Sequence, residues 1–100
     1  GDENIFDFIT KQFEVLNDQS AEKFYMTAAF GQLLHKVNSP SKFKKGIDLI
    51  VKFRESIPKE YRSQSDPYFN NKVLAEILKA KKAKGQQDLV DMVIAVIPKM

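Results

Sequence analysis

Residues 39–58 read SPSKFKKGIDLIVKFRESIP, and this stretch decides the fold class. Ser39 followed by Pro40 is typical of a helix start, since a serine side chain caps the first turn and proline suits the first helical position. Apolar residues then recur at helical spacing on one broad face: Phe43, Ile47, Leu49, Ile50, Val51 and Phe53. Pro58 disfavours α geometry in the residue before it, so we expect this helix to end near Ile57.

The residues before this stretch predict two further helices. The first has an apolar stripe at spacings of four, four and three, formed by Ile5, Ile9, Phe13 and Leu16. Residues 17–20 form a break, and Ser20 can cap the next helix. The second stripe consists of Met26, Phe30, Leu33, Leu34 and Val37. The small residues Ala28, Ala29 and Gly31 interrupt it, so a neighbouring helix could approach closely there.

The residues after this stretch predict a polar connector and two more helices. Residues 58–66 form the connector, with one helical turn around Lys59–Arg62, and Asp66-Pro67 repeats the cap-then-proline pattern. The next apolar stripe contains Phe69, Val73, Leu74, Ile77 and Leu78, and Gly85 is the expected left-handed stop. Residues 89–97 are apolar on nearly every side, so we expect this last helix to be the most buried, or sandwiched between neighbours.

These patterns predict one all-α domain of about five antiparallel helices over residues 1–100. A pairwise array of this kind resembles HEAT or armadillo units, and we expect the end of an α-superhelix, although no internal sequence repeat is evident. No apolar run approaches the roughly 20 residues that span a bilayer. The sequence begins with Gly1 in place of methionine, and we interpret Gly1 as a residue left when a C-terminal segment was excised from a longer chain. The compartment of that longer chain is left open.

The charge is unevenly divided along the chain. The net charge of +3 combines −3 over residues 1–41 with +6 over residues 42–100. A basic half can indicate a nucleic-acid partner. Acidic residues are interspersed throughout this half, however, so we interpret it as solvated helix faces and expect no nucleic-acid binding.

Motifs for self-sufficient catalysis are missing from the sequence. It contains no cysteine, and no HExxH, GxSxG, glycine-rich phosphate loop or EF-hand loop. The only histidine, His35, has no carboxylate or imidazole three or four positions away, so we expect no metal site there. The lysine cluster of residues 79–84 lacks interleaved aromatic residues and is interpreted as a solvated helix end. We therefore expect no catalytic, cofactor-binding or metal-ligating residue in this chain.

One stretch has a more distinctive sequence than the other helical segments. Residues 46–58 (GIDLIVKFRESIP) lead into residues 61–70 (YRSQSDPYFN). An aromatic-rich helix, a small-residue helix around Thr27–Gly31 and a helix with Val51 and Phe53 come before this connector, and a final helix pair follows it. This order, over roughly residues 5–98, resembles the C-terminal helical domain of bacterial zinc aminopeptidases of the aminopeptidase N type.

The resemblance implies a non-catalytic role within a larger enzyme. In that family the catalytic domain carries HExxH, a further glutamate for zinc, and an exopeptidase motif. The C-terminal superhelix closes over the active-site cavity and restricts peptide entry. None of those motifs is present here, so the resemblance assigns no catalytic residue to this chain and implies zinc for the parent enzyme alone. The implied partners are the rest of the parent enzyme and, indirectly, its peptide substrate.

Two classes of function therefore remain open: the helical segment of an aminopeptidase and a free-standing all-α interaction module. An excised array end should expose an apolar face where upstream helices once packed, and Phe6 and Phe8 are our candidates for that face. An independent module should bury them. Four basic residues are candidates for contact with a peptide carboxylate, with ordinary surface charge as the alternative: Lys44, Lys45, Arg54 and Arg62.

Overall fold

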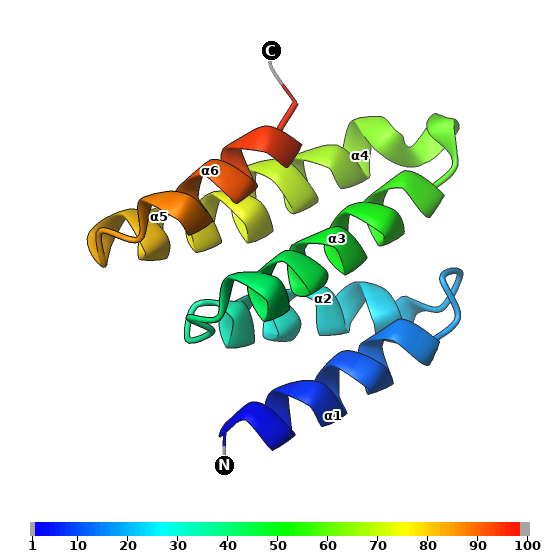
Figure 1. Ribbon diagram of the computed structural model, residues 1–100. Helices are drawn as coiled ribbons and strands as arrows, with labels where there is room; N and C mark the ends of the chain where they lie inside the picture. The colour runs from blue at the N-terminus through cyan, green and yellow to red at the C-terminus, as the bar shows by residue number, and fades with distance from the viewer. Residues whose placement is uncertain (1, 99–100) are drawn as a thin grey trace.

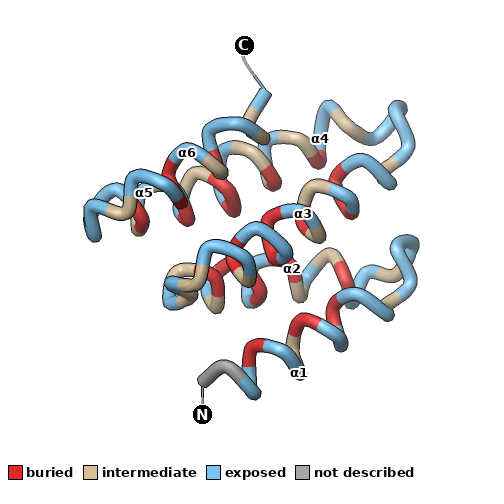
Figure 2. Tube along the Cα trace, in the orientation of Figure 1, coloured by how far each residue is buried: buried red, intermediate tan, exposed pale blue. Residues whose placement is uncertain are grey.

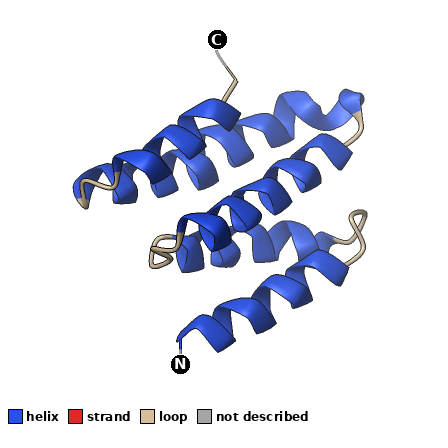
Figure 3. Ribbon diagram, in the orientation of Figure 1, coloured by secondary structure: helices blue, strands red, loops and turns tan. Residues whose placement is uncertain are grey.

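The computed structural model describes residues 2–98, all of whose regular structure is helical (Figure 3). Gly1, interpreted above as a leftover residue, lies outside the described residues. In chain order the elements are α1 (Asp2–Val15), α2 (Ala21–Leu34), α3 (Pro40–Ser56), the 3₁₀ turn η1 (Lys59–Tyr61), α4 (Arg62–Pro67), the π-helical stretch η2 (Tyr68–Leu74), α5 (Ala75–Ala83) and α6 (Gln87–Val96). The predicted all-α class is confirmed.

The helices form two layers. Figure 1 shows α1, α3 and α6 side by side in one layer, with α2 and the continuous α4–η2–α5 rod in the other. The chain reverses direction at each connection, so the helices of one layer run antiparallel to those of the other. The Cα extents of 37 × 32 × 16 Å fit a slab two helices thick. This arrangement is compatible with a HEAT-like array.

The predicted helix ends are mostly confirmed. Ser20 and Ser39 are N-caps whose side chains accept hydrogen bonds from the backbone N–H groups of Lys23 and Lys42. Pro40 begins α3, and Ile57 is the residue at which α3 stops. Gly85 has a φ of +69°, and its N–H bonds Lys82 O while that of the next residue bonds Lys81 O. This pair of bonds is the Schellman arrangement that closes a helix C-terminus.

The predicted helix start at Asp66-Pro67 is wrong. The helix begins at Arg62 and runs through Pro67, whose φ and ψ of −60° and −34° are helical. The π-helical stretch η2 follows directly. Proline has no N–H for the i−4 carbonyl and its ring crowds that carbonyl, which gives a physical reason for an irregular helix at this point.

A continuous set of aromatic rings joins the two layers. Phe13 stacks on Phe30 with ring centroids 4.7 Å apart, and it meets Phe53 edge-on at 6.0 Å. Phe53 then contacts Phe69 at 5.5 Å, and Phe69 contacts Phe24 at 5.9 Å. Figure 2 shows the buried residues on the facing sides of the helices. Four of the five helical segments that enter this core do so through phenylalanine, so edge and face packing of rings contributes much of its cohesion.

The sequence left two alternatives for residues 89–97, the most buried helix or a helix sandwiched between neighbours. The first is wrong, and contacts of this helix with both α3 and α5 agree with the second. Within α6, Leu89, Val90 and Val93 are buried, but Ile94 is 50% exposed. Helix α6 packs against α3 and α5 and lies at one edge of its layer (Figure 1). A helix at the edge of a layer can bury only the face that meets its neighbours.

The expectation of close helix approach at small residues is confirmed at Gly31 and not at the two alanines. A Cβ on Gly31 would lie 3.0 Å from Val73 Cγ1. Ala28 and Ala29 are exposed. The tightest approach is instead at Gly46, where an added Cβ would overlap the side chain of Leu34.

Candidate functional site

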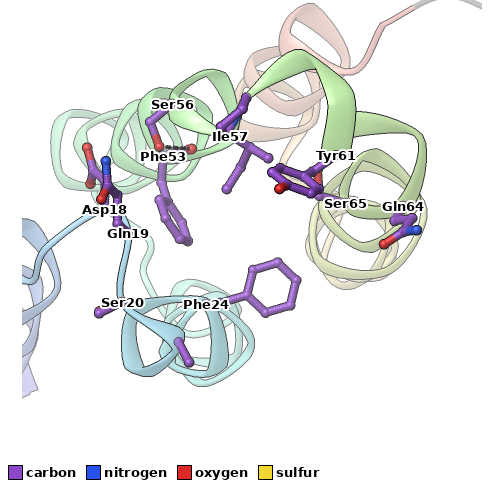
Figure 4. A pocket seen from close by; sticks show the side chains of 12 residues that line it. Asp18, Gln19, Ser20, Phe24, Phe53, Ser56, Ile57, Tyr61, Gln64 and Ser65 are labelled. Carbon is purple, nitrogen blue, oxygen red and sulfur yellow. Dashed lines mark hydrogen bonds between the residues drawn. The ribbon is translucent and has the colours of Figure 1, made fainter.

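A hollow lies at one end of the helix hairpins. It has a volume of about 570 Å³ and is formed by the N-terminus of α2, the C-terminus of α3, and the η1–α4 segment (Figure 4). We call it the hairpin-end pocket. Its lining residues are Asp18, Gln19, Ser20, Ala21, Phe24, Phe53, Ser56, Ile57, Pro58, Tyr61, Gln64 and Ser65.

Two sequence breaks create this pocket. The break at residues 17–20 starts α2, and the stop at Pro58 ends α3, so both connections leave the layers at the same end of the molecule (Figure 1). Phe24 lies one turn into α2 and Phe53 one turn before the end of α3. Their rings therefore form the inner wall, and the 58%-exposed Tyr61 stands at the mouth.

Three of the polar side chains that line the pocket have partners within the chain. Asp18 Oδ1 lies 2.6 Å from Lys23 Nζ. The Ser20 hydroxyl accepts the N–H of Lys23, and Ser56 Oγ donates to Phe53 O at 2.6 Å. None of these three bonds pairs a hydroxyl nucleophile with a general base.

Ser65 differs from the other polar residues of the pocket. It is only 7% exposed, and its hydroxyl has no hydrogen-bond partner among the described residues. A buried hydroxyl without a partner costs about 1–3 kcal/mol, so this group requires an explanation. Ser65 lies in the sequence YRSQSDP, but nothing in that sequence signals an unsatisfied hydroxyl, since burial and missing partners become visible only after folding.

The four predicted carboxylate-contact residues do not form one site. Lys44 and Lys45 are exposed on the first half of α3, where Lys44 pairs with Asp48 at 3.1 Å. Arg54 lies nine residues beyond Lys45, roughly 13 Å along the helix axis. With Glu14, Ser41, Asp48, Leu49 and Lys52, the two lysines line a shallow hollow of about 420 Å³, separate from the hairpin-end pocket.

The side chains of the two arginines form hydrogen bonds with other groups of the chain. Arg54 is 7% exposed, and its Nη1 donates to Asn70 Oδ1 and to Val96 O, both at 2.8 Å. Arg62 donates to Ile57 O and Glu55 O, both at 2.9 Å. These carbonyls lie at the C-termini of α6 and α3, where helices leave unsatisfied acceptors. The two side chains therefore cap helices, and neither is placed as a free receptor for a peptide carboxylate.

Buried lysines cap two further helix ends, those of α1 and α2. Lys23 Nζ donates to Leu16 O, next to the end of α1, at 3.2 Å. Lys81 Nζ donates to His35 O and Val37 O, just beyond α2, at 3.1 and 2.7 Å, and lies 5.2 Å from the centre of the Phe43 ring. Lys81 is 0% exposed, so the interpretation of residues 79–84 as a wholly solvated face is wrong at this position.

Burial lowers the pKa of two groups at this helix end. Loss of solvation, reinforced by nearby Lys84, lowers the pKa of Lys81 to about 8. His35 is half-buried, and desolvation is the main reason that its pKa falls below the usual value; Glu76 opposes this shift, and Lys81 and Lys84 add to it. His35 Nδ1 and Nε2 have no acidic cluster around them: within residues 2–98 no group of three or more His, Cys, Asp or Glu side chains could hold a metal.

The predicted apolar face of the first helix is partly wrong. Phe6 is 3% exposed and stacks over Phe30 at 6.3 Å, so it belongs to the core. Phe8 is 65% exposed. Ile5 and Val15 are also exposed, at 55% and 65%, and their spacings of three and seven from Phe8 place all three on one side of α1. We call these three residues the α1 outer stripe.

No known protein family, curated protein or solved structure matches this chain. Among residues 2–98, no helix has the length and apolar character required to cross a membrane.

Proposed function

We propose that this chain is a non-catalytic helical segment at the end of a larger α-helical array, as in the C-terminal domain of a zinc aminopeptidase of the aminopeptidase N type. In that role it helps to close and shape the cavity through which peptides reach the catalytic domain. The zinc ion belongs to the parent's catalytic domain, and this chain supplies no ligand to it.

The α1 outer stripe is the observation that carries this proposal. Ile5, Phe8 and Val15 expose large apolar side chains on the side of α1 away from its contacts with α2. The half-buried residues Ile9 and Leu16 connect this stripe to the core side, so the apolar surface of α1 is wider than the part that α2 covers. An internal helix of an array has this character, because neighbours pack on two of its sides.

The layered arrangement also supports an array. Each hairpin contributes one helix to each layer, and successive hairpins stack in the same direction (Figure 1). A further hairpin added before α1 would continue both layers and would cover the α1 outer stripe.

The most direct test is the gene sequence upstream of the codon for Gly1. The proposal expects an HExxH motif a few hundred codons upstream, followed by a glutamate about twenty residues later, the zinc-ligand pattern that the resemblance implies. An open reading frame that starts at this chain, or a long upstream region without the motif, contradicts an aminopeptidase parent.

The purified chain tests the apolar face separately. We expect the double variant Phe8→Lys/Val15→Lys to bind less of a hydrophobic fluorescent dye and to self-associate less in sedimentation analysis than the unmodified chain. Tyr25→Lys is the matched control, since Tyr25 is 76% exposed on α2 and outside the stripe. Equal dye binding and self-association by the double variant and the unmodified chain would mean that the stripe is not an interaction face.

The second candidate function is a free-standing all-α interaction module. The hairpin-end pocket favours it, because a hollow of about 570 Å³ with aromatic walls is within the size range of binding sites. The upstream gene sequence distinguishes the two candidates.

A further inference from the structure

We propose that the exposed face of α6 terminates the helical array, because Asp88 and Asp91 keep the α1 outer stripe of a second copy of the chain from docking there. This face consists of Gln87, Asp88, Asp91, Ile94 and Ala95, and we call it the α6 face. The inference rests on the array arrangement in the proposed function and not on the aminopeptidase parent.

The two edges of the slab differ in apolar character. Helix α1 lies at one edge and α6 at the other (Figure 1). The exposed large apolar side chains of α1 are Ile5, Phe8 and Val15, whereas α6 exposes Ile94. In a helical array the faces between repeats are apolar and the outer face of a terminal repeat is polar. The α1 edge therefore has the character of an internal face, and the α6 edge that of a terminal face.

An acidic side chain lies at the centre of the α6 face. Asp91 is three or four residues from each of Gln87, Asp88, Ile94 and Ala95, so the five exposed residues share one side of the helix. Gln87 Nε2 donates to Asp91 Oδ1 at 2.8 Å. Neither Asp88 nor Asp91 has a salt-bridge partner among residues 2–98. Both carboxylates therefore depend on water for the solvation of their charge.

The contact that these carboxylates oppose is a head-to-tail contact between copies. In it, the α5–α6 hairpin of one copy would take the place of a hairpin before α1 of the next copy and would cover the α1 outer stripe. The sequence of α1 contains four acidic residues and one basic residue, Lys11. A single ammonium group cannot neutralise both carboxylates of the α6 face while the acidic residues of α1 add like charge. The contact would therefore remove water from Asp88 and Asp91 without supplying enough cations.

This exclusion limits how copies of the chain can associate. A head-to-tail contact uses two different faces, so it can repeat and build open-ended oligomers. A contact between two α1 outer stripes uses the same face twice and closes at a dimer. With the α6 face excluded, association through the stripe stops at two copies.

Sedimentation analysis of the purified chain over a range of concentrations tests the proposal. We expect the unmodified chain to associate no further than a dimer. The variant Asp88→Leu/Asp91→Leu should show a weight-average mass that increases with concentration beyond that of a dimer. Addition of Phe8→Lys to this variant should remove the increase, because the growing oligomer needs the α1 outer stripe.

The matched control is Glu22→Leu/Glu60→Leu, which replaces two exposed acidic residues outside α6 and should behave as the unmodified chain does. Asp88 Oδ1 also accepts the N–H of Leu89 at 3.0 Å, so leucine at position 88 weakens the start of α6. Circular dichroism therefore checks that each variant is folded. Asp88→Asn/Asp91→Asn retains an oxygen acceptor at this position and removes both charges, and we expect it to associate beyond a dimer, though less than the leucine variant.

Three results would overturn the proposal. The first is equal association of the unmodified chain and both folded variants of the α6 face. The second is growth of the unmodified chain beyond a dimer that Phe8→Lys abolishes, since the α6 face would then already accept the stripe. The third is growth of the leucine variant that Phe8→Lys leaves unchanged. None of these results concerns the upstream gene sequence, so failure of this proposal is distinguishable from failure of the aminopeptidase parent.

Discussion

At the scale of single residues, buried basic side chains cap helix C-termini, a role that residue type alone does not predict. Lys23 and Lys81 are 5% and 0% exposed, yet both amino groups bond carbonyls at helix ends. A helix C-terminus has unpaired acceptors and a partial negative charge, and both favour a nearby cation. These contacts offset part of the desolvation cost of burying an ammonium group.

Lys81 makes stability depend on pH in the alkaline range. Its pKa of about 8 in the folded chain is below the ordinary value of 10.5, chiefly because burial disfavours the charged form. Between these two values the unfolded chain binds more protons than the folded chain, so the contribution of Lys81 to stability increases as pH rises through this window. Below pH 8 both states are protonated and the folded chain carries the full desolvation cost.

We expect the free energy of unfolding of the unmodified chain to rise relative to that of Lys81→Met by about 1–2 kcal/mol between pH 7.5 and 10, after allowance for solvent screening beside Lys84. Urea denaturation of both proteins across this range measures it. Tyr68, whose pKa burial raises, is present in both proteins and cancels in the difference. A constant difference across the range would show that Lys81 titrates at its ordinary pKa.

Gly46 is a second residue whose importance depends on its neighbours. An added Cβ would overlap the fully buried Leu34, with Leu34 Cδ1 at 3.1 Å. We expect Gly46→Ala to destabilise the chain by about 1 kcal/mol, because overpacking costs about 1–3 kcal/mol and alanine returns about 1 kcal/mol of helix propensity.

Thermal and urea unfolding measure this cost, and a double-mutant cycle with Leu34→Ala assigns its cause. The effect of Gly46→Ala should shrink or reverse when Leu34 is shortened, since the overlapping atoms are then gone. A cost that is the same in both backgrounds would exclude overlap with Leu34 as the cause.

At the scale of elements, the rod from Arg62 to Ala83 shows an apparent conflict between sequence and structure. Pro67 is exposed and lies inside this rod, immediately before the π-helical stretch. In the π-helical stretch the side chains of Phe69, Val73 and Leu74 are nevertheless buried in the core. Packing of these side chains therefore outweighs the local preference of proline to begin a helix.

We expect Pro67→Ala to raise the free energy of unfolding by about 1 kcal/mol. Alanine restores an N–H that can bond within the helix, although the greater freedom of the unfolded chain cancels part of the gain. Urea denaturation measures the change, and Pro40→Ala is the control, because proline at the first helical position of α3 forfeits no intrahelical bond. Destabilisation by Pro67→Ala would instead indicate that proline is needed to set the π-helical geometry.

At the scale of the whole molecule, many of the basic residues after residue 41 bond carbonyl or carboxylate groups of the chain itself. Arg54, Arg62, Lys81 and Lys84 all bond backbone carbonyls near helix ends. Lys42 and Lys44 pair with Asp7 and Asp48. The surface that remains is one of mixed charge, and the absence of nucleic-acid binding stays a prediction.

We therefore expect no binding to a fluorescent 30-base-pair DNA duplex at 20 mM salt, measured by anisotropy. A strongly basic peptide of similar length is the positive control. Binding by this chain with an affinity that falls steeply as salt increases would contradict the expectation, because such a slope reports counterions released from phosphates.

Much of the secondary structure could be predicted because its signals are local. Ser20, Ser39, Pro58 and Gly85 act through their own backbone geometry and the adjacent turn, and each marks the boundary that the structure has. The predictions that failed required knowledge of neighbours. Phe6 and Phe8 are equally apolar in sequence, but only Phe6 faces Phe30.

The sequence by itself determined the all-α class, most helix boundaries and the absence of a recognisable catalytic motif, because periodicity, capping and motif spacing are properties of short segments. Only the tertiary structure decided which helix lies at the edge of a layer, which cations cap helix ends, and that the breaks at residues 17–20 and 58 enclose a pocket. Burial and hydrogen-bond partners are set by residues far apart in the chain: Ser65 is an ordinary serine in the sequence, and the packing of α2, α3 and α4 makes it a buried hydroxyl without a partner.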